Sequence, residues 1–203
     1  LDSMVRSLKN ENNDPRFVSI FDARKYLLSY VFDASKLEQI DIPKLRQSLD
    51  EHIIGHKEVK DKLLADLDSL KLGVTSMNQP LGLFLFTGPT GVGKTETAKV
   101  MAKYLDLPLV QVNMATYDGF KKGSPDRELI ERKSGVPFVL LLDEVDKRTD
   151  GYASAADRLN ELRSLFATGV YGKGTEDELD LRNAIIIMTA NYADNLIISL
   201  GDT

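Results

Sequence analysis

The segment from Gly88 to Thr95 has the residue types and the spacing that bind phosphate groups. Its sequence, GPTGVGKT, matches the pattern G-x-x-x-x-G-K-[ST], in which glycines let backbone N–H groups point inward and a helix N-terminus adds partial positive charge. Lys94 would reach the β- and γ-phosphates of a nucleotide, and the Thr95 hydroxyl would bind Mg²⁺. A side chain at Gly93 would push the phosphates out of hydrogen-bond range. The predicted phosphate-binding residues are Gly88, Pro89, Thr90, Gly91, Val92, Gly93, Lys94, Thr95 and Glu96.

Two acidic residues, Asp143 and Glu144, follow directly after the apolar run VLLL. Asp143 is expected to hold Mg²⁺ through water, completing its ligand shell together with Thr95 and the phosphates. Glu144 is expected to orient or deprotonate the attacking water. A carboxylate poised for water suits hydrolysis, whereas a kinase must keep water out. Asp146 and Lys147, which come next, are equally well explained as a solvated charge pair.

Asn191 ends a second apolar run, IIIMTA. Its amide both accepts and donates hydrogen bonds, so it could hold the attacking water between Glu144 and the γ-phosphate. A strand-end asparagine is by itself more often a turn former. We predict a role for Asn191 in positioning water because it follows the two stronger motifs in the chain.

Apolar runs alternating with helical patterns predict the elements that position these groups. Strands are expected at residues 81–88, 108–114, 137–144 and 183–191, with helices at 93–105, 126–133 and 154–166 between them. Short continuous apolar strands separated by helices are typical of an α/β fold with a mainly parallel sheet. Two further helices, broken at Gly55, precede the first strand, and a helical pattern covers 22–32. The polar stretch 172–180 is expected to be a loop, such as a hairpin tip.

Composition limits the other possibilities. The 203 residues are 42% hydrophobic and 28% charged, with a net charge of −5, which does not favour binding to duplex nucleic acid. The chain has no cysteine, which fits a reducing, cytosolic compartment. The longest apolar runs are too short for a membrane span. His52 and His56 lack an evident acid–base partner and are interpreted as surface or helix-cap residues.

The motifs resemble those of the AAA+ ATPases, and most closely the second ATPase module of Clp-type chaperones, which are ring-forming protein unfoldases and disaggregases. The resemblance rests on NQPLGLFLFTGPTGVGKTETAKVMA, VNMATY, VLLLDEVDK and LRNAIIIMTAN, and covers about residues 44–195. It implies a three-layer αβα P-loop NTPase fold, the AAA+ large subdomain, over 46–203, with the helical lid outside this sequence. Residues 1–45 would then be an N-terminal extension or, as we favour, the tail of a preceding module.

The resemblance also implies ATP and Mg²⁺ as cofactors and Asn191 as the sensor-1 residue. LDEHIIGHKEV resembles the family segment in which positions like Ile53 and Ile54 flank adenine, although His56 stands where the family has glutamine. The expected partners are protein substrates and other subunits of a hexameric ring, without a membrane. In the family, the arginine finger and the sensor-2 arginine follow later in the chain, so neither is assigned, and weak binding with slow hydrolysis is expected of this chain.

One departure concerns substrate contact. Clp-type motors grip polypeptide with an aromatic–glycine loop between the second strand and the acidic strand, and here that interval contains only DGFKKG. Phe120 could grip substrate beside Lys121 and Lys122, but a solvated turn is the favoured interpretation. Alternative functions are a nucleic-acid loader or helicase, a nucleotide-gated scaffold and a P-loop kinase. Glu144 argues against the scaffold, and the absence of an arginine-rich lid pattern argues against the kinase.

Overall fold

Four of the apolar segments form one parallel sheet. The computed structural model describes residues 35–72, 79–133, 136–147 and 155–191, so the predicted helix at 22–32 lies outside the described residues. The strands are β1 (Gly82–Thr87), β2 (Leu109–Asn113), β3 (Phe138–Asp143) and β6 (Ala184–Ala190). Their order is β1-β6-β3-β2, with every neighbouring pair parallel. The predicted α/β fold class is confirmed.

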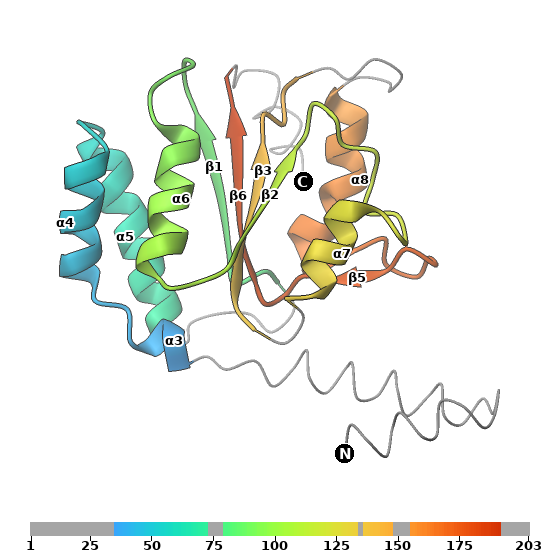
Figure 1. Ribbon diagram of the computed structural model, residues 1–203, viewed down its shortest axis with the longest axis horizontal. Coiled ribbons are helices and arrows are strands. Elements are labelled where there is room, and N and C mark those ends of the chain that lie inside the picture. The colour runs from blue at the N-terminus through green and yellow to red at the C-terminus, as the bar shows by residue number, and fades with distance from the viewer. Residues whose placement is uncertain (1–34, 73–78, 134–135, 148–154, 192–203) are drawn as a thin grey trace.

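Helices cover both faces of the sheet, which gives three layers (Figure 1). One side carries α4 (Ile42–His52), α5 (Lys57–Lys71) and α6 (Lys94–Tyr104), and the other carries α7 (Pro125–Glu131) and α8 (Ala155–Thr168). A single turn, α3 (Ser35–Glu38), precedes α4. None of the helices in the described ranges combines the length and the apolar content needed to cross a bilayer.

The central strands are continuous apolar runs because both faces of the sheet are covered. Every residue of β6 is buried, and so are the first five residues of β3. Successive side chains point to opposite faces, and both faces are covered, so neither strand has a polar side. Val139, Leu141, Ile185 and Ile187 belong to the cluster beneath α4, α5 and α6, whereas Leu140, Leu142, Ile186 and Met188 belong to the cluster beneath α7 and α8. The residues of β1 are partly or largely exposed because β1 forms an edge of the described sheet.

The helix boundaries follow local signals. Asp41 accepts a hydrogen bond from the Lys44 N–H at the start of α4, and Ser124 does the same for the Arg127 N–H at the start of α7. The predicted break at Gly55 lies between α4 and α5, where Gly55 has a φ of 77°. The division of the chain at residue 45 stays a prediction, but Leu37, on its N-terminal side, is buried in the same cluster as α4.

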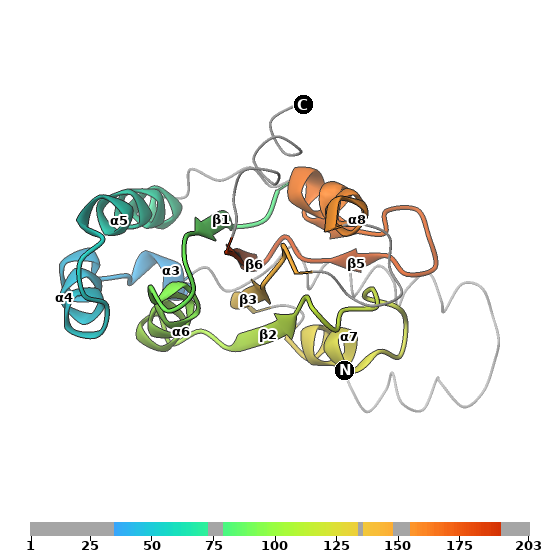
Figure 2. The same cartoon turned by 90° about the horizontal axis from the view of Figure 1, so that it is seen from above.

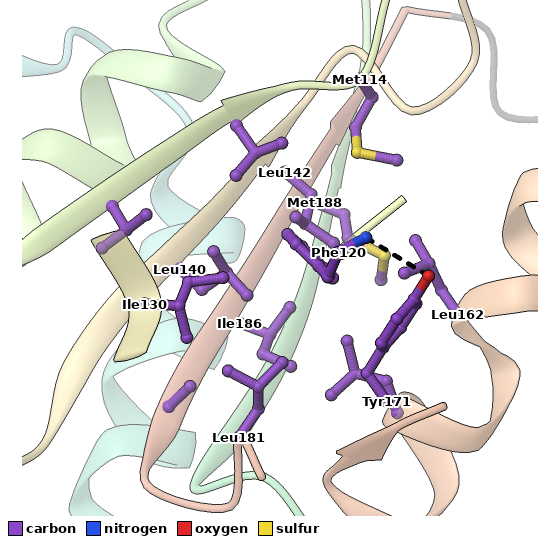
Figure 3. Close-up of a cluster of buried hydrophobic side chains, with 14 of the residues drawn as sticks. Met114, Phe120, Ile130, Leu140, Leu142, Leu162, Tyr171, Leu181, Ile186 and Met188 are labelled. Carbon is purple, nitrogen blue, oxygen red and sulfur yellow. Dashed lines mark hydrogen bonds between the residues drawn. The ribbon is translucent and has the colours of Figure 1, made fainter. Parts of the chain in front are cut away.

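The predicted hairpin is present, since β4 (Val170–Tyr171) and β5 (Leu179–Asp180) pair in antiparallel fashion around 172–178. At Phe120 itself the structure differs from both interpretations of the sequence. Phe120 is fully buried, and its ring meets those of Tyr117 and Tyr171 edge-on at centroid distances of 5.0 and 5.1 Å. Its N–H donates to the Tyr171 hydroxyl over 3.3 Å (Figure 3). Phe120 is therefore a core residue and not an exposed gripping residue, whereas Lys121 and Lys122 beside it are exposed, as expected of a solvated turn.

A buried arginine explains why this segment holds its shape. Arg127 is 3% exposed and donates to the carbonyl oxygens of Phe120, Asp177 and Glu178, while its Nε donates to Glu131. One guanidinium thus joins the segment after β2, the helix α7 and the loop of the hairpin. The polar composition of residues 118–123 predicts a turn without contacts to other elements, but the hydrogen bonds of Arg127 attach this segment to α7 and to the hairpin loop.

Candidate active site

The phosphate-binding motif forms the loop between β1 and α6. Gly88, Gly91 and Gly93 all have positive φ, and at Gly93 the value is 95°, a conformation that other residues rarely adopt. A Cβ at Gly93 would lie 3.5 Å from the Ile53 side chain, which is ordinary contact, so backbone conformation rather than local crowding requires glycine there. Gly93 caps α6 without a side-chain hydrogen bond, which leaves the N–H groups of the first turn available to an anion.

Lys94 lies over this loop with its ammonium group surrounded by oxygen atoms. Its Nζ donates to the carbonyl oxygens of Gly88 at 2.7 Å and Pro89 at 2.8 Å, and to Asn191 Oδ1 at 3.0 Å. A lysine ammonium has three N–H donors, and these three acceptors match that number. The group is therefore held where phosphate oxygens could replace the present acceptors.

Asp143 and Thr95 meet directly, although they lie 48 positions apart in the sequence. The Thr95 hydroxyl donates to Asp143 Oδ1 over 2.9 Å, and Gln111 donates from its side-chain amide to Asp143 Oδ2 over 3.0 Å. Within the described residues, no group of three or more histidine, cysteine or acidic side chains is arranged to hold a metal ion. Proteins usually bind Mg²⁺ through one or two carboxylates together with phosphates and water, so the hydroxyl and carboxylate present here fit that ion.

Thr189, on β6, positions both acidic residues. Its side chain is 1% exposed, and its hydroxyl donates to Asp143 Oδ1 over 2.6 Å while accepting the Glu144 N–H over 2.9 Å. Glu144 has a φ of 62°, a left-handed conformation that costs a residue with a side chain about 1–2 kcal/mol. The Glu144 carboxylate forms an ion pair with Lys147 at 2.6 Å.

Asn191 lies between the phosphate loop and the acidic strand. Besides the bond from Lys94, its Oδ1 is 3.4 Å from the Thr90 hydroxyl, which donates to it. Its backbone N–H donates to Asp146 Oδ2 over 2.8 Å. Asp146 and Lys147 thus contact Asn191 and Glu144 respectively, whereas the sequence left a solvated charge pair equally open.

The order of the strands explains this convergence. Thr87 lies opposite Ala190, and Leu142 lies opposite Met188, so the carboxyl ends of β1, β6 and β3 stand level at one edge. Figure 2 looks onto this edge and shows β6 between the other two strands. Ligands of open α/β sheets bind at such an edge. The residues predicted to bind phosphate, magnesium and water are therefore neighbours.

A cavity of about 160 Å³ continues from the phosphate loop toward α4 and α5. Val92, Lys94 and Thr97 line it on the loop side, and its other lining residues are Leu49, Ile53, His56, Val59, Lys60, Leu63, Leu85, Phe86 and Thr87. Of the two residues expected to flank adenine, Ile53 lines the cavity, whereas Ile54 is 93% exposed and does not. Glu96, in the first turn of α6, is exposed to solvent.

Comparison with known proteins agrees with the arrangement. The ATPase family associated with various cellular activities (AAA) matches residues 84–201, more than half of the chain. The chain belongs to the AAA family of ATPases. It is similar to the chaperone protein ClpB of Wolinella succinogenes, with 31% identity covering 83% of this chain and 22% of that protein. ClpB of Vibrio vulnificus is 28% identical, covering 94% of this chain and 23% of that protein.

These comparisons confirm the resemblance to a Clp-type AAA+ module, and the chain spans about a fifth of the length of the ClpB relatives that it matches. Sequence reasoning missed Thr189, Gln111 and Lys60. The first two lie within predicted strands and the third within a predicted helix, so only their neighbours in space distinguish them. His52 and His56 are exposed, and His52 Nδ1 is hydrogen-bonded to the Ser48 carbonyl. His56 is the N-cap of α5 and lines the cavity.

Proposed function

We propose that this AAA module binds ATP with Mg²⁺ and hydrolyses it, and that hydrolysis powers remodelling of protein substrates by a ring of such modules. One observation carries the ATPase proposal: Thr95 and Asp143 share a hydrogen bond of 2.9 Å beside Lys94 and Asn191, which are joined at 3.0 Å. These groups come from three separate strand ends. This convergence is expected of a site that binds a nucleoside triphosphate, whereas a structural turn would not require it.

Each residue has a distinct task in this proposal. Thr95 and Asp143 would hold the magnesium ion, which supplies charge neutralisation at the phosphates. Lys94 would exchange its present acceptors for phosphate oxygens. Glu144 would accept a proton from the attacking water, and Asn191 would orient that water. The Lys147 ion pair must open or turn for Glu144 to do so, and both side chains are partly exposed, at 50% and 30%, so the pair is weak enough to exchange.

Nucleotide binding is tested by titrating labelled ATP and ADP, with Mg²⁺, against the chain and its Lys94→Ala variant. Lys99→Ala is the matched control, because Lys99 is exposed on the same helix. We expect Lys94→Ala to weaken binding at least tenfold and Lys99→Ala to leave it unchanged. Equal affinity in all three proteins would refute the assignment of the phosphate loop.

The remodelling part of the proposal is supported by the similarity to ClpB, whose name describes it as a chaperone. The cytosolic location predicted from composition and the hexameric ring belong to the same proposal. Substrate class is tested by measuring phosphate release with unfolded casein and, separately, with single-stranded DNA. Stimulation by casein alone supports a protein substrate, and stimulation by DNA alone would replace it with the loader or helicase.

Ring assembly is tested with Glu144→Gln, which we expect to bind nucleotide without cleaving it. Sedimentation velocity should show a larger species in Mg²⁺ and ATP than in buffer. A single sedimentation coefficient in both conditions, with nucleotide bound, would contradict assembly through this module alone.

A further inference from the structure

The Asp143 carboxylate accepts hydrogen bonds from three different elements. Thr95, on α6, and Thr189, on β6, both donate to Oδ1, over 2.9 and 2.6 Å respectively. Gln111, on β2, donates from its amide nitrogen Nε2 to Oδ2 over 3.0 Å. All three donors are uncharged, and within the described residues no lysine, arginine or histidine lies within ion-pair distance of Asp143. The carboxylate is therefore held by its neighbours while its negative charge stays available to a cation.

The place of Gln111 on β2 explains how it reaches Asp143. Val110 and Val112 belong to the cluster beneath α7 and α8, and successive side chains of a strand point to opposite faces. Gln111 therefore stands on the face of the sheet that carries α6. The residue directly opposite Asp143 is Asn113, and Gln111 lies two positions before it. Two positions along a strand are about 6.6 Å, a distance that a glutamine side chain spans better than the shorter asparagine.

The fold has little need of this hydrogen bond. The Gln111 side chain is exposed, and substitutions at exposed positions usually change stability little. A hydrogen bond of the same kind joins Gln47 Nε2 to the Glu51 carboxylate over 2.9 Å on α4, and neither of those residues lines the cavity. The two glutamines thus make the same bond in two settings. Of the two, Gln111 is the one whose partner is assigned to the magnesium ion.

The hydrogen bonds decide how much of the Asp143 carboxylate an ion can reach. An ionised carboxylate has about four lone-pair sites. Oδ1 accepts two of the three bonds and Oδ2 accepts one, which leaves one site, on Oδ2. Thr95 donates its hydrogen to Asp143 and so keeps oxygen lone pairs for the ion. Without Gln111, both lone pairs of Oδ2 would be open, and the carboxylate could turn about its contacts at Oδ1.

This restriction suits a small ion that keeps its water. Mg²⁺ retains several waters and is bound through one or two carboxylates, whereas Ca²⁺ takes about six to eight oxygen ligands, often with both oxygens of a carboxylate. We propose that Gln111 is a positioning residue, whose amide holds Asp143 so that the carboxylate presents one open site and the module prefers Mg²⁺ to Ca²⁺. The inference rests on the proposed binding of nucleotide with Mg²⁺ and deepens it.

The first test compares the two metal ions with the same nucleotide. The affinity of a labelled, non-hydrolysable imido analogue of ATP is measured in EDTA, in Mg²⁺ and in Ca²⁺, for the original chain and for Gln111→Met. Methionine has a similar length and no N–H donor. We expect Gln111→Met to bind as the original chain does in EDTA, and to lose about tenfold of the affinity gained with Mg²⁺. The gain with Ca²⁺ should not fall, so the preference for Mg²⁺ over Ca²⁺ should fall about tenfold.

Two further variants separate positioning from stability. Gln47→Met removes the matched bond on α4 and should leave the responses to both metal ions unchanged. Gln111→Glu keeps the length and shape of the side chain but replaces the donor with a second carboxylate, so it should shift the preference toward Ca²⁺ still further than Gln111→Met does. The Tm of the two methionine variants, measured without nucleotide, should stay close to that of the original chain, because both positions are exposed.

These readouts distinguish the inference from the proposed function. An original chain that fails to bind the analogue under all three conditions would overturn the nucleotide site and the role of Gln111 with it. Binding that neither metal ion strengthens would overturn the magnesium assignment and, again, the role of Gln111. If Mg²⁺ strengthens binding equally in the original chain and in Gln111→Met, the role of Gln111 alone is wrong. A matching loss of affinity in EDTA would make Gln111 a general support of the site and would also overturn the proposal.

Discussion

Thr189→Val tests whether one hydroxyl positions the acidic strand. Valine matches the shape of threonine but removes the bond of 2.6 Å to Asp143 and the bond of 2.9 Å from the Glu144 N–H. A hydrogen bond to a charged group contributes about 1.5–3 kcal/mol, and a buried donor left without a partner costs about 1–3 kcal/mol. Relief of the left-handed Glu144 backbone would return about 1–2 kcal/mol. The expected loss in unfolding free energy is therefore about 2–4 kcal/mol.

The assay combines thermal unfolding with magnesium dependence. For a chain of this size the loss corresponds to a fall in Tm of roughly 4–16 °C. Because Thr189 holds a carboxylate that would bind magnesium, the Mg²⁺ concentration that supports half of the ATP binding should rise about tenfold or more. Thr189→Ser is the control, since it keeps the hydroxyl and should restore the magnesium dependence. A Thr189→Val protein with the original Tm and the original Mg²⁺ requirement would refute this account of the site.

Three other predictions concern separate features. Phe120→Ala should lower the free energy of unfolding, measured in urea, by about 3–5 kcal/mol, because it empties a fully buried position. Lys121→Ala should change it by less than about 0.5 kcal/mol. A similarly small effect of Phe120→Ala would contradict the burial of Phe120. Glu144→Gln should lower phosphate release about 100-fold or more with ATP affinity kept within about threefold, and undiminished release would exclude Glu144 as the base. The hydrogen bond from Lys60 lowers the pKa of Asp50 below its ordinary value of 3.8. The stability that the Asp50–Lys60 pair contributes is therefore present above pH 3.8 and is lost as the pH falls through the lowered pKa. Asp50→Asn should flatten the dependence of Tm on pH in this acidic range, and an unchanged dependence would contradict the role of the pair.

The sequence predicts those site residues whose side-chain chemistry and whose position after a predicted strand both indicate a function. Asp143 ends β3, Asn191 directly follows β6, and Lys94 begins the helix after the glycine-rich loop that follows β1, so a parallel sheet must bring them to one edge. The order of the strands is less accessible. Placing β6 between β1 and β3 depends on pairing between segments about 100 residues apart, and the apolar patterns of the strands are too similar to specify which neighbours pair.

Residues that work through a neighbour escape sequence reasoning for a physical reason. Thr189 has the β-branched side chain expected of any strand, and nothing in its own segment shows that its hydroxyl reaches Asp143 on β3. Lys60 occupies a helix rich in charged residues, where lysine normally indicates a solvated face. Its burial depends on Asp50 and Ile53, which α4 supplies. In both cases the deciding partner is on another element.

Phe120 shows the opposite error, in which local composition suggests too much. Two glycines and two lysines around one aromatic residue are typical of an exposed turn. The predicted strands do not contradict this expectation, because the segment lies between two of them. Phe120 is buried although Lys121 and Lys122 beside it are exposed, because Tyr171 and Arg127, contributed by the hairpin and by α7, satisfy the Phe120 N–H and carbonyl groups. A short polar segment can thus bury its aromatic residue when distant groups complete its hydrogen bonds.

The end of β6 joins the two halves of the site. Thr189 lies one residue before the end of β6, and Asn191 is the first residue after the strand. Thr189 contacts the residues assigned to magnesium and water, whereas Asn191 contacts Lys94, assigned to the phosphates. Phosphate oxygens would compete with Asn191 for Lys94, and any resulting shift of the Asn191 backbone would strain its bond to Asp146, two residues beyond Glu144. The end of β6 therefore contacts both halves of the site, through Thr189 on the side of the acidic residues and through Asn191 on the side of Lys94.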